Sequence, residues 1–277
     1  MVKKIDGLEN CIQLYDVVPM RLIQITDCHL GSRAGQPLLG IDTDESFADV
    51  LQCLSTHEPH VDFLVASGDV ASEADVAAYE RFLSLVQAQL DLPVAWLSGN
   101  HDLDAIMRRF PREQVQRDYL EFDHWQVVLL NSSIPGEERG EVQQAEIDRL
   151  RRCLDNSSKH ALVFVHHQPV PVRCDWIEQY VISNARQLLD TLSEYPQVKA
   201  LAWGHVHQEF NSQHQHFSLH ATPSTCIQFK PHSADFALDN TMPGYRWFNL
   251  HADGRLETGV ERVAEKAYGI DFASAGY

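Results

Sequence analysis

Short hydrophobic runs alternate with longer amphipathic stretches between residues 20 and 204. Six runs of five or six residues are rich in Val, Ile and Leu, and each gives way to polar residues or glycine. They cover residues 21–26, 63–67, 94–98, 125–130, 161–165 and 198–203. Runs of this length and composition are typical of buried strands. We therefore predict six strands in this part of the chain.

The stretches between these runs have the spacing of helices. They cover residues 45–54, 76–90, 142–154 and 185–192. In the third stretch Ile147, Leu150 and Leu154 recur at intervals of three and four, which places them on one face of a helix, and charged residues occupy the other face. Strands that alternate with helices predict an α/β fold.

After Gly204 the pattern changes to short strand-like segments at residues 216–221, 225–229, 245–250 and 256–263. No second set of helices accompanies them, so they cannot close a core of their own. We therefore assign residues 1–277 to a single domain, in which residues 208–277 add strands that can double the sheet into a sandwich. Residues 267–277 are expected to form a loosely held tail.

The composition and net charge of the chain limit the kinds of molecule that it is expected to bind. The chain has 277 residues, and 22 basic against 39 acidic side chains give a formal charge of −17. This charge disfavours binding to nucleic acid or to an anionic membrane, because both need a basic surface. An anionic small-molecule substrate remains compatible if metal ions supply positive charge locally.

The cysteines and the amino terminus indicate a cytoplasmic protein. The six cysteines contain no Cys-x-x-Cys pair and are too scattered for a disulfide scaffold, which fits a reducing compartment. Residues 1–10 lack the apolar stretch of a signal peptide, and no run approaches the length of a membrane-spanning helix. The oligomeric state is not predicted by any of these features.

Polar side chains of the types that bind metals follow five of the six predicted strands. The clusters are Asp27 and His29; Gly68 and Asp69; Gly99, Asn100, His101 and Asp102; His166 and His167; and Gly204, His205 and His207. In open α/β sheets the ligand crevice lies beyond the carboxyl ends of the strands, so these clusters are expected to converge.

Carboxylates and imidazoles without a cysteine suit divalent ions such as Mn²⁺, Fe²⁺, Zn²⁺ or Co²⁺. A single ion would leave most of these side chains buried without a partner, whereas two ions would use them. Two ions about 3.5–4 Å apart are the arrangement of hydrolytic phosphate chemistry. Gly68, Gly99 and Gly204 each precede a candidate ligand, where a backbone without a side chain can turn sharply or approach the ions.

The combined pattern resembles that of the calcineurin-like metallophosphoesterases. It consists of Asp27-x-His29, Gly68-Asp69, Gly99-Asn100-His101-Asp102, His166-His167 and Gly204-His205-x-His207, and it spans residues 21–207. The stretches 174–176 and 221–231 further resemble the bacterial class III 3′,5′-cyclic AMP phosphodiesterases of the CpdA type. With these stretches the resemblance covers nearly the whole chain.

The resemblance implies a four-layer αββα sandwich of two mixed sheets flanked by helices, and it implies two divalent ions. Fe²⁺ and Mn²⁺ are favoured, with Zn²⁺, Co²⁺ or Mg²⁺ as alternatives. Asp27, His29 and His207 would bind the first ion, Asp69 would bridge, and Asn100, His166 and His205 would bind the second. His166 is preferred to His167 because it directly follows its strand.

The resemblance also implies roles at the reaction centre. His101 would contact the phosphate and protonate the leaving oxygen, and Asp102 would orient it. The substrate-binding residues would be His29, Asp69, Asn100, His101 and His207. Trp176, Tyr180 and Phe229 can be read as a purine-stacking surface or as ordinary packing, and aromatic residues at this density favour packing.

The activity implied is hydrolysis of 3′,5′-cyclic AMP to 5′-AMP by a metal-bridging hydroxide, which would lower intracellular cyclic AMP. Because the metal motifs recognise phosphate rather than the group attached to it, other phosphodiesters, phosphomonoesters or phosphoproteins remain alternative substrates. A noncatalytic scaffold on the same frame is disfavoured because no ligand of the pattern is missing.

Overall fold

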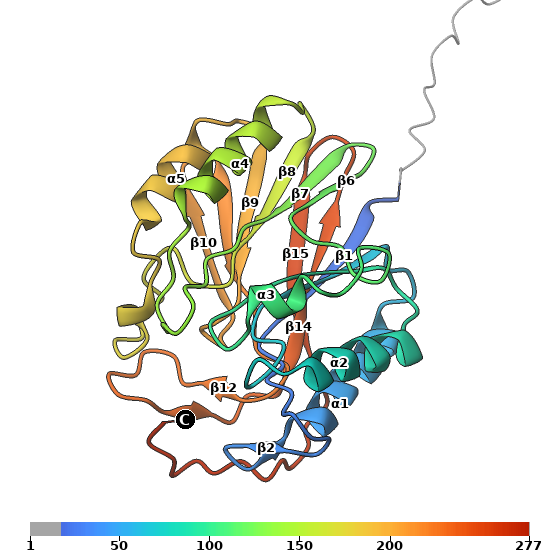
Figure 1. Ribbon diagram of the computed structural model, residues 1–277, viewed down its shortest axis with the longest axis vertical. Coiled ribbons are helices and arrows are strands. Elements are labelled where there is room, and N and C mark those ends of the chain that lie inside the picture. The colour runs from blue at the N-terminus through green and yellow to red at the C-terminus, as the bar shows by residue number, and fades with distance from the viewer. Residues whose placement is uncertain (1–17, 277) are drawn as a thin grey trace, which may run out of the picture.

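The computed structural model describes residues 18–276, and Figure 1 shows their arrangement. Residues 1–10, for which the sequence predicts no signal peptide, and Cys11 lie outside the described residues. Within them Cys28, Cys53, Cys153, Cys174 and Cys226 are free thiols. Among the helices of residues 18–276 there is none with the length and apolar character needed to cross a bilayer.

One sheet has five strands in the order β15-β14-β1-β4-β5. The strands are β1 Met20–Ile25, β4 Phe63–Ser67, β5 Val94–Leu97, β14 Gly244–Leu250 and β15 Leu256–Arg262. β1, β4 and β5 are parallel, and β14 and β15 extend the sheet in antiparallel fashion on the far side of β1.

The second sheet has six strands in the order β10-β11-β9-β8-β7-β6. They are β6 Tyr119–Glu121, β7 Trp125–Leu129, β8 His160–Phe164, β9 Val198–Trp203, β10 Phe210–His214 and β11 Phe217–Ala221. The four inner strands are parallel, and the antiparallel strands β6 and β10 form the two edges. Both sheets are therefore mixed.

The connections form helices and two short hairpins. The helices are α1 Thr43–His57, α2 Val76–Gln89, α3 Asp104–Met107, α4 Gln144–Asp155 and α5 Ala185–Ser193, with a 3₁₀ turn at Glu178–Tyr180. The hairpins pair β2 Pro37–Leu38 with β3 Ile41–Asp42, and β12 Gln228–Phe229 with β13 Leu238–Asp239.

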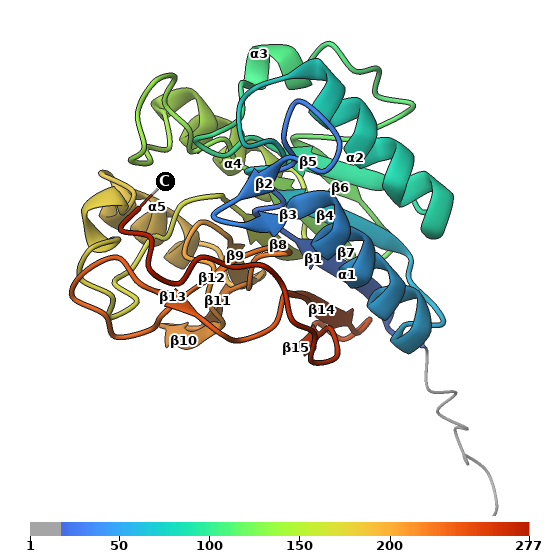
Figure 2. The ribbon, with the colours of Figure 1, turned by 90° about the horizontal axis from the view of Figure 1, so that it is seen from below.

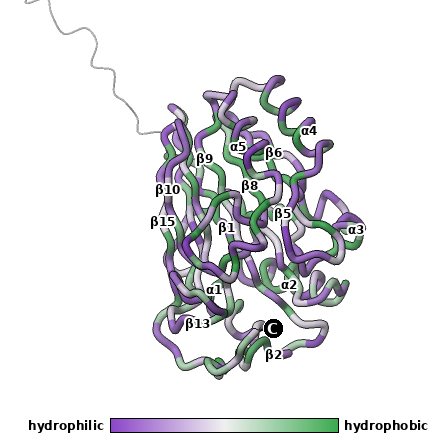
Figure 3. Tube along the Cα trace, turned by 90° about the vertical axis from the view of Figure 1, so that its left-hand side faces the viewer, coloured by the Kyte–Doolittle hydropathy of each residue, from purple (hydrophilic) through white to green (hydrophobic). Residues whose placement is uncertain are grey.

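Alternation along the strands produces four layers. In β1, Ile23 and Ile25 pack in the cluster that contains residues of α1 and α2, whereas Leu22 packs between the sheets against residues of β7 and β8. A third cluster joins the six-stranded sheet to α4 and α5. Figure 2 shows the helices on the outer faces of the sheets. Figure 3 shows many of the hydrophobic positions in the inner strands. The predicted αββα architecture is confirmed.

The expectation of a loosely held tail is wrong for the part of residues 267–277 that the structure describes. The Tyr268 hydroxyl donates to Asp49 Oδ2 at 2.8 Å, and the Asp271 amide donates to the Leu39 carbonyl at 2.8 Å. These contacts join the segment to α1 and to the β2–β3 hairpin. Its composition gave no sign of them because both partners lie more than two hundred residues earlier in the chain.

Candidate metal centre

The carboxyl ends of strands from both sheets meet at one place. Asp27 and His29 follow β1, Asp69 follows β4, and Asn100 follows β5; His166 follows β8, and His205 and His207 follow β9. The two halves are joined directly, because the His205 amide donates to both carboxylate oxygens of Asp27, at 3.0 and 3.1 Å. All seven predicted ligand residues are therefore brought into one site.

Asp27, His29 and His207 form the first cluster. The Nε2 atom of His207 lies 3.4 Å from Asp27 Oδ1 and 3.3 Å from His29 Nε2, and one potential ligand atom from each residue falls within 4.8 Å of the others. All three side chains are buried. A carboxylate oxygen and two imidazole nitrogens at this spacing can bind one divalent ion.

His166, Asn100 and Asp69 form the second cluster. His166 Nε2 lies 3.2 Å from Asn100 Oδ1 and 3.2 Å from Asp69 Oδ2, while His166 Nδ1 lies 2.9 Å from the Ser67 carbonyl. The ring of His205 packs edge-on against His166, with centroids 5.2 Å apart. Asp69 also lies 3.8 Å from His29 Nε2, so its carboxylate stands between the two clusters.

His167 remains an alternative member of this cluster. One of its ring nitrogens falls within 4.8 Å of ligand atoms of His166 and His205. Its Nδ1 lies 2.9 Å from the Ser132 hydroxyl, however, and among the described residues no hydrogen bond joins it to Asn100. The geometry therefore favours His166 as the residue that faces Asp69 and Asn100.

The backbone is strained at the ligands themselves. Asp27, His29, Asp69, His205 and His207 all have positive φ, between 47° and 62°. Residues other than glycine rarely adopt this left-handed conformation, and it costs on the order of 1–3 kcal/mol for each residue. Asp27 and His29 are two residues apart, as are His205 and His207, so strand alternation alone would place each pair on one face, and the positive φ values turn the chain directly after the strand.

All three glycines singled out in the sequence are required by close packing. At Gly204 a Cβ would collide with the side chains of Thr26 and Asp27. Gly68 has a φ of 100°, and a Cβ there would collide with the ring of His166. A Cβ on Gly99 would collide with the carboxylate of Asp69. All three positions let a ligand from another strand approach the backbone closely.

Burial and the charges of neighbouring groups shift the pKa values of the candidate ligands. Burial disfavours the charged form of Asp69, but the facing His166 and His101 outweigh it and hold the pKa of Asp69 well below its usual range. Burial lowers the pKa values of His29 and His205 well below 6.5, so both are neutral at pH 7. Burial also opposes the charge of His166, but the facing Asp69 outweighs it and raises the pKa of His166 to about 9. His166 must therefore release a proton when a divalent ion binds, whereas His29 and His205 are already neutral.

A buried nitrogen of His205 that lacks a hydrogen-bond partner within residues 18–276 independently indicates that the site binds a ligand. His205 Nε2 is fully buried and has no hydrogen-bond partner among the described residues. A buried polar nitrogen of this kind is costly unless a ligand satisfies it. Together with the two clusters around Asp69, it fits a centre for two divalent metal ions.

His101 and Asp102 are placed differently from each other. His101 donates its backbone amide to Asp69 Oδ1 at 2.9 Å, and its ring Nδ1 lies 2.9 Å from the Ser72 carbonyl. The Asp102 carboxylate instead accepts the amides of Val70, Ala71 and Gly99 at 3.0–3.2 Å. The contact that orients the imidazole is thus a backbone carbonyl, whereas Asp102 ties the loops after β4 and β5 together.

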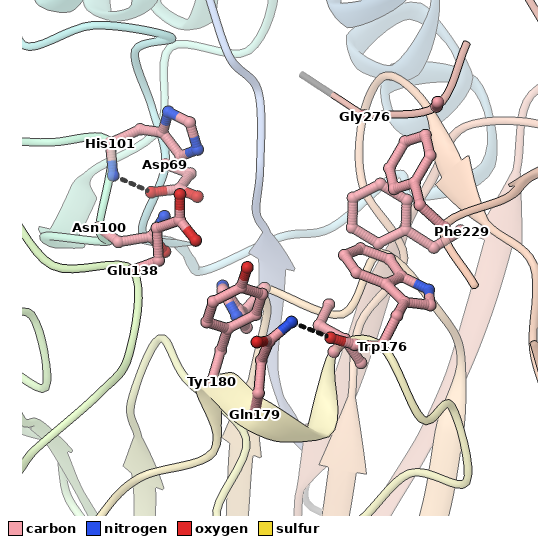
Figure 4. Close-up of a pocket in the computed structure, with 13 residues that line it drawn as sticks. Asp69, Asn100, His101, Glu138, Trp176, Gln179, Tyr180, Phe229 and Gly276 are labelled. Atoms are coloured by element: carbon pink, nitrogen blue, oxygen red, sulfur yellow. Dashed lines mark hydrogen bonds between the residues drawn. The ribbon is translucent and has the colours of Figure 1, made fainter. Parts of the chain in front are cut away.

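A cavity of about 300 Å³ opens beside these residues. Figure 4 shows Asp69, Asn100 and His101 along one side of it. Sequence reasoning missed Glu138, Gln179, Phe236, Ala275 and Gly276, which also line it. Gln179 lies in the 3₁₀ turn and the others lie in loops, all without a recognisable motif, so no pattern in the sequence marked them.

Comparisons with known proteins agree with this geometry. The family model for calcineurin-like phosphoesterases matches residues 20–209. A protein of Pseudomonas aeruginosa named 3′,5′-cyclic adenosine monophosphate phosphodiesterase CpdA is 42% identical over 258 residues, which are 92% of this chain and 94% of the relative. The protein of the same name from Escherichia coli K12 is 39% identical over 263 residues, 93% of this chain and 95% of the relative.

Solved structures share the fold at low identity. A dimetal phosphatase from Danio rerio superposes with a TM-score of 0.60 at 18% identity, covering 89% of this chain and all of that one. A purple acid phosphatase from yellow lupin gives 0.60 at 11% identity, covering 88% of this chain and 53% of that one. With a family model that matches well over half of its length, this chain belongs to the calcineurin-like phosphoesterase family.

Proposed function

We propose that this chain hydrolyses 3′,5′-cyclic AMP to 5′-AMP with two divalent metal ions. The observation that carries the proposal is the convergence of six candidate ligand side chains around Asp69 at the edge of a cavity large enough for a small ligand. The curated relatives with this name align with more than nine tenths of the chain, which supports the choice of substrate.

The ligand assignment follows the two clusters. Asp27, His29 and His207 would hold the first ion, Asn100, His166 and His205 would hold the second, and Asp69 would contribute to both. Imidazole and carboxylate ligands without thiolate suit Fe²⁺ and Mn²⁺, which we propose as the native ions. When bound, the two ions would neutralise the phosphodiester oxygens and lower the pKa of a water molecule.

The chain's own contribution to the leaving step comes from His101. Its amide is fixed on Asp69 Oδ1, and its Nδ1 is fixed on the Ser72 carbonyl. A carbonyl accepts but cannot donate, so Nδ1 carries a hydrogen, and we assign the transfer to the substrate to the other ring nitrogen, Nε2. A protonated Nε2 would donate to the ribose 3′ oxygen as its bond to phosphorus breaks.

The test is turnover of cyclic AMP by purified, metal-loaded protein, with 5′-AMP identified as the product. Asn100→Ala should lose the second ion, whereas His101→Ala should keep both ions and lose the proton donor. We expect both variants to be at least about 100-fold slower than the parent chain. No turnover by the parent chain, or full turnover by both variants, would contradict the proposal.

A second candidate keeps the chemistry and changes the substrate. The ligand clusters recognise phosphate, so another phosphodiester or a phosphomonoester fits the same ions. A panel of cyclic AMP, cyclic GMP, a glycerophosphodiester and a simple monoester at one metal concentration decides between them. The highest kcat/KM should belong to cyclic AMP, and a higher value for a noncyclic ester would favour the second candidate.

A further inference from the structure

The cavity beside the metal centre has two chemically different sides. Figure 4 shows Asp69, Asn100 and Glu138 on one side and Phe229 and Gly276 on the other. The first side presents oxygen and nitrogen atoms next to the predicted ions. The second presents aromatic rings and a glycine backbone.

The apolar side is a compact aromatic cluster. Trp176 packs edge-on against Phe229 and Phe236, with ring centroids 4.9 and 5.0 Å apart. Phe229 also stacks on the ring of His207, at 4.1 Å and nearly parallel. The cluster is therefore continuous with a predicted ligand of the first ion, and Trp176 and Phe229 line the same cavity as Asp69.

The segment 264–276, which we call the strap, runs from the end of β15 to this side of the cavity. Figure 2 shows it passing between the β2–β3 and β12–β13 hairpins. Its first half is held on α1, where Lys266 Nζ lies 2.6 Å from Asp49 Oδ2 and 2.8 Å from Glu45 Oε1. The Tyr268 hydroxyl bonds to the same Asp49 carboxylate.

The middle of the strap packs closely against Gly40. A Cβ at Gly40 would collide with the Gly269 carbonyl and would lie 3.1 Å from the Asp271 nitrogen, and Gly40 has a φ of 89°. The next contact, from the Asp271 amide to the Leu39 carbonyl, fixes the direction of the chain. The path that follows brings Ala275 and Gly276 to the cavity.

We propose that the strap is a specificity-determining wall that encloses the purine of a cyclic nucleotide against the aromatic cluster. This inference rests on the proposed function and adds to it the part of the site that recognises the base. A cyclic nucleotide is charged at its phosphate and flat and largely apolar at its base, which matches the two sides of the cavity. Ala275 and Gly276 suit such a wall because a methyl group on Ala275 and no side chain on Gly276 leave room for a ring.

The experiment compares two substrates with the same reacting group. The first is cyclic AMP, and the second is the 3′,5′-cyclic phosphate of methyl riboside, which has no base. A chain that ends after Phe272 keeps the contacts of Lys266, Tyr268 and Asp271 but lacks the wall. We expect its kcat/KM to fall about tenfold or more for cyclic AMP and to stay within about twofold for the substrate without a base.

A substitution tests the same wall without shortening the chain. Gly40→Val should displace the strap and reproduce the selective loss. Because valine is strained at a φ of 89°, its thermal unfolding temperature should fall as that of Gly136→Val does, while the variant stays folded at the assay temperature. Gly136→Val is the matched control, because Gly136 also has a positive φ, of 80°, and has nothing within 4 Å of the added Cβ. It should keep the parent's ratio of the two kcat/KM values.

An unchanged ratio in both the shortened chain and Gly40→Val would overturn the proposal. An equal loss on both substrates by a folded variant would overturn it as well, because the strap would then support the metal centre and not the base. A parent chain that hydrolyses the substrate without a base but not cyclic AMP would contradict the proposed function itself, and with it the selectivity assigned to the strap.

Discussion

His166 Nε2 lies 3.2 Å from Asp69 Oδ2, although Asp69 follows a strand of the five-stranded sheet and His166 a strand of the six-stranded sheet. The contact spans the interface between the two sheets. The metal centre is therefore a product of their packing, and a change at Asp69 should affect both clusters at once.

Asp69→Asn should reduce the metal content below two ions for each chain. The substitution keeps the size of the side chain but removes the anionic charge that stands between the clusters. Turnover should fall by at least about 100-fold, since each ion contributes several kcal/mol to neutralising the phosphate. Metal content by elemental analysis and kcat are the measurements. Asp148→Asn, on the exposed face of α4, is the control and should match the parent.

His101→Gln should be sensitive to the leaving group. Cyclic AMP expels an alkoxide that needs a proton, so the variant should lose about 10²–10⁴ in kcat. A diester that expels 4-nitrophenolate needs no proton and should lose less than about tenfold. Rate ratios for the two substrates at equal metal content provide the check. Equal losses on both would show that His101 acts in some way other than as a proton donor.

Asp102→Ala should destabilise the fold rather than act on proton transfer. The carboxylate accepts three backbone amides and the Tyr79 hydroxyl, the last at 3.0 Å. Its loss leaves buried donors unsatisfied and should lower the free energy of unfolding by about 3 kcal/mol or more. Tyr79→Phe removes one of these bonds and should cost about 1 kcal/mol. Urea denaturation measures both, and an Asp102→Ala chain as stable as Tyr79→Phe would contradict this role.

The burial of His220 leads us to predict that the protein loses stability in acid. Burial, assisted by the nearby Arg246, lowers its pKa from 6.5 to about 3. The folded chain therefore binds fewer protons at His220 than the unfolded chain does. The contribution of His220 to the free energy of unfolding is fully present above about pH 6.5 and is lost as the pH falls toward 3. Between pH 7 and pH 5 the loss amounts to about 2 kcal/mol.

His220→Gln removes this linkage and should make the free energy of unfolding less dependent on pH over the same range. His60→Gln changes a surface histidine and should keep the parent's slope. Urea denaturation at pH 7, 6 and 5 compares the three chains. Parallel curves for the parent and His220→Gln would show that His220 does not contribute to the acid sensitivity.

The central strands were predictable because their side chains are buried on both faces. The runs predicted at residues 63–67 and 198–203 coincide with β4 and β9. β10, Phe210–His214, was missed because it is an exposed edge strand with the polar sequence Asn-Ser-Gln between its ends. Its pairing with β11 through backbone hydrogen bonds leaves no hydrophobic pattern to detect.

The convergence of the candidate ligands was predictable for a different reason. Parallel strands place their carboxyl ends together, and the residue types at those ends are the types that metals bind. The partner of the His101 ring was not predictable, because the Ser72 carbonyl is a backbone group that any residue could supply. The path of the strap was not predictable either, because it depends on the missing side chain of Gly40 and on a close approach to Gly269.

The most direct measurement of the central claim is the position of the metal ions in crystals of the manganese-loaded chain, located by anomalous scattering. Two peaks about 3.5–4 Å apart, one on each side of the Asp69 carboxylate, are the result that we predict. A single peak, or two peaks too far apart for Asp69 to contact both, would contradict the shared centre.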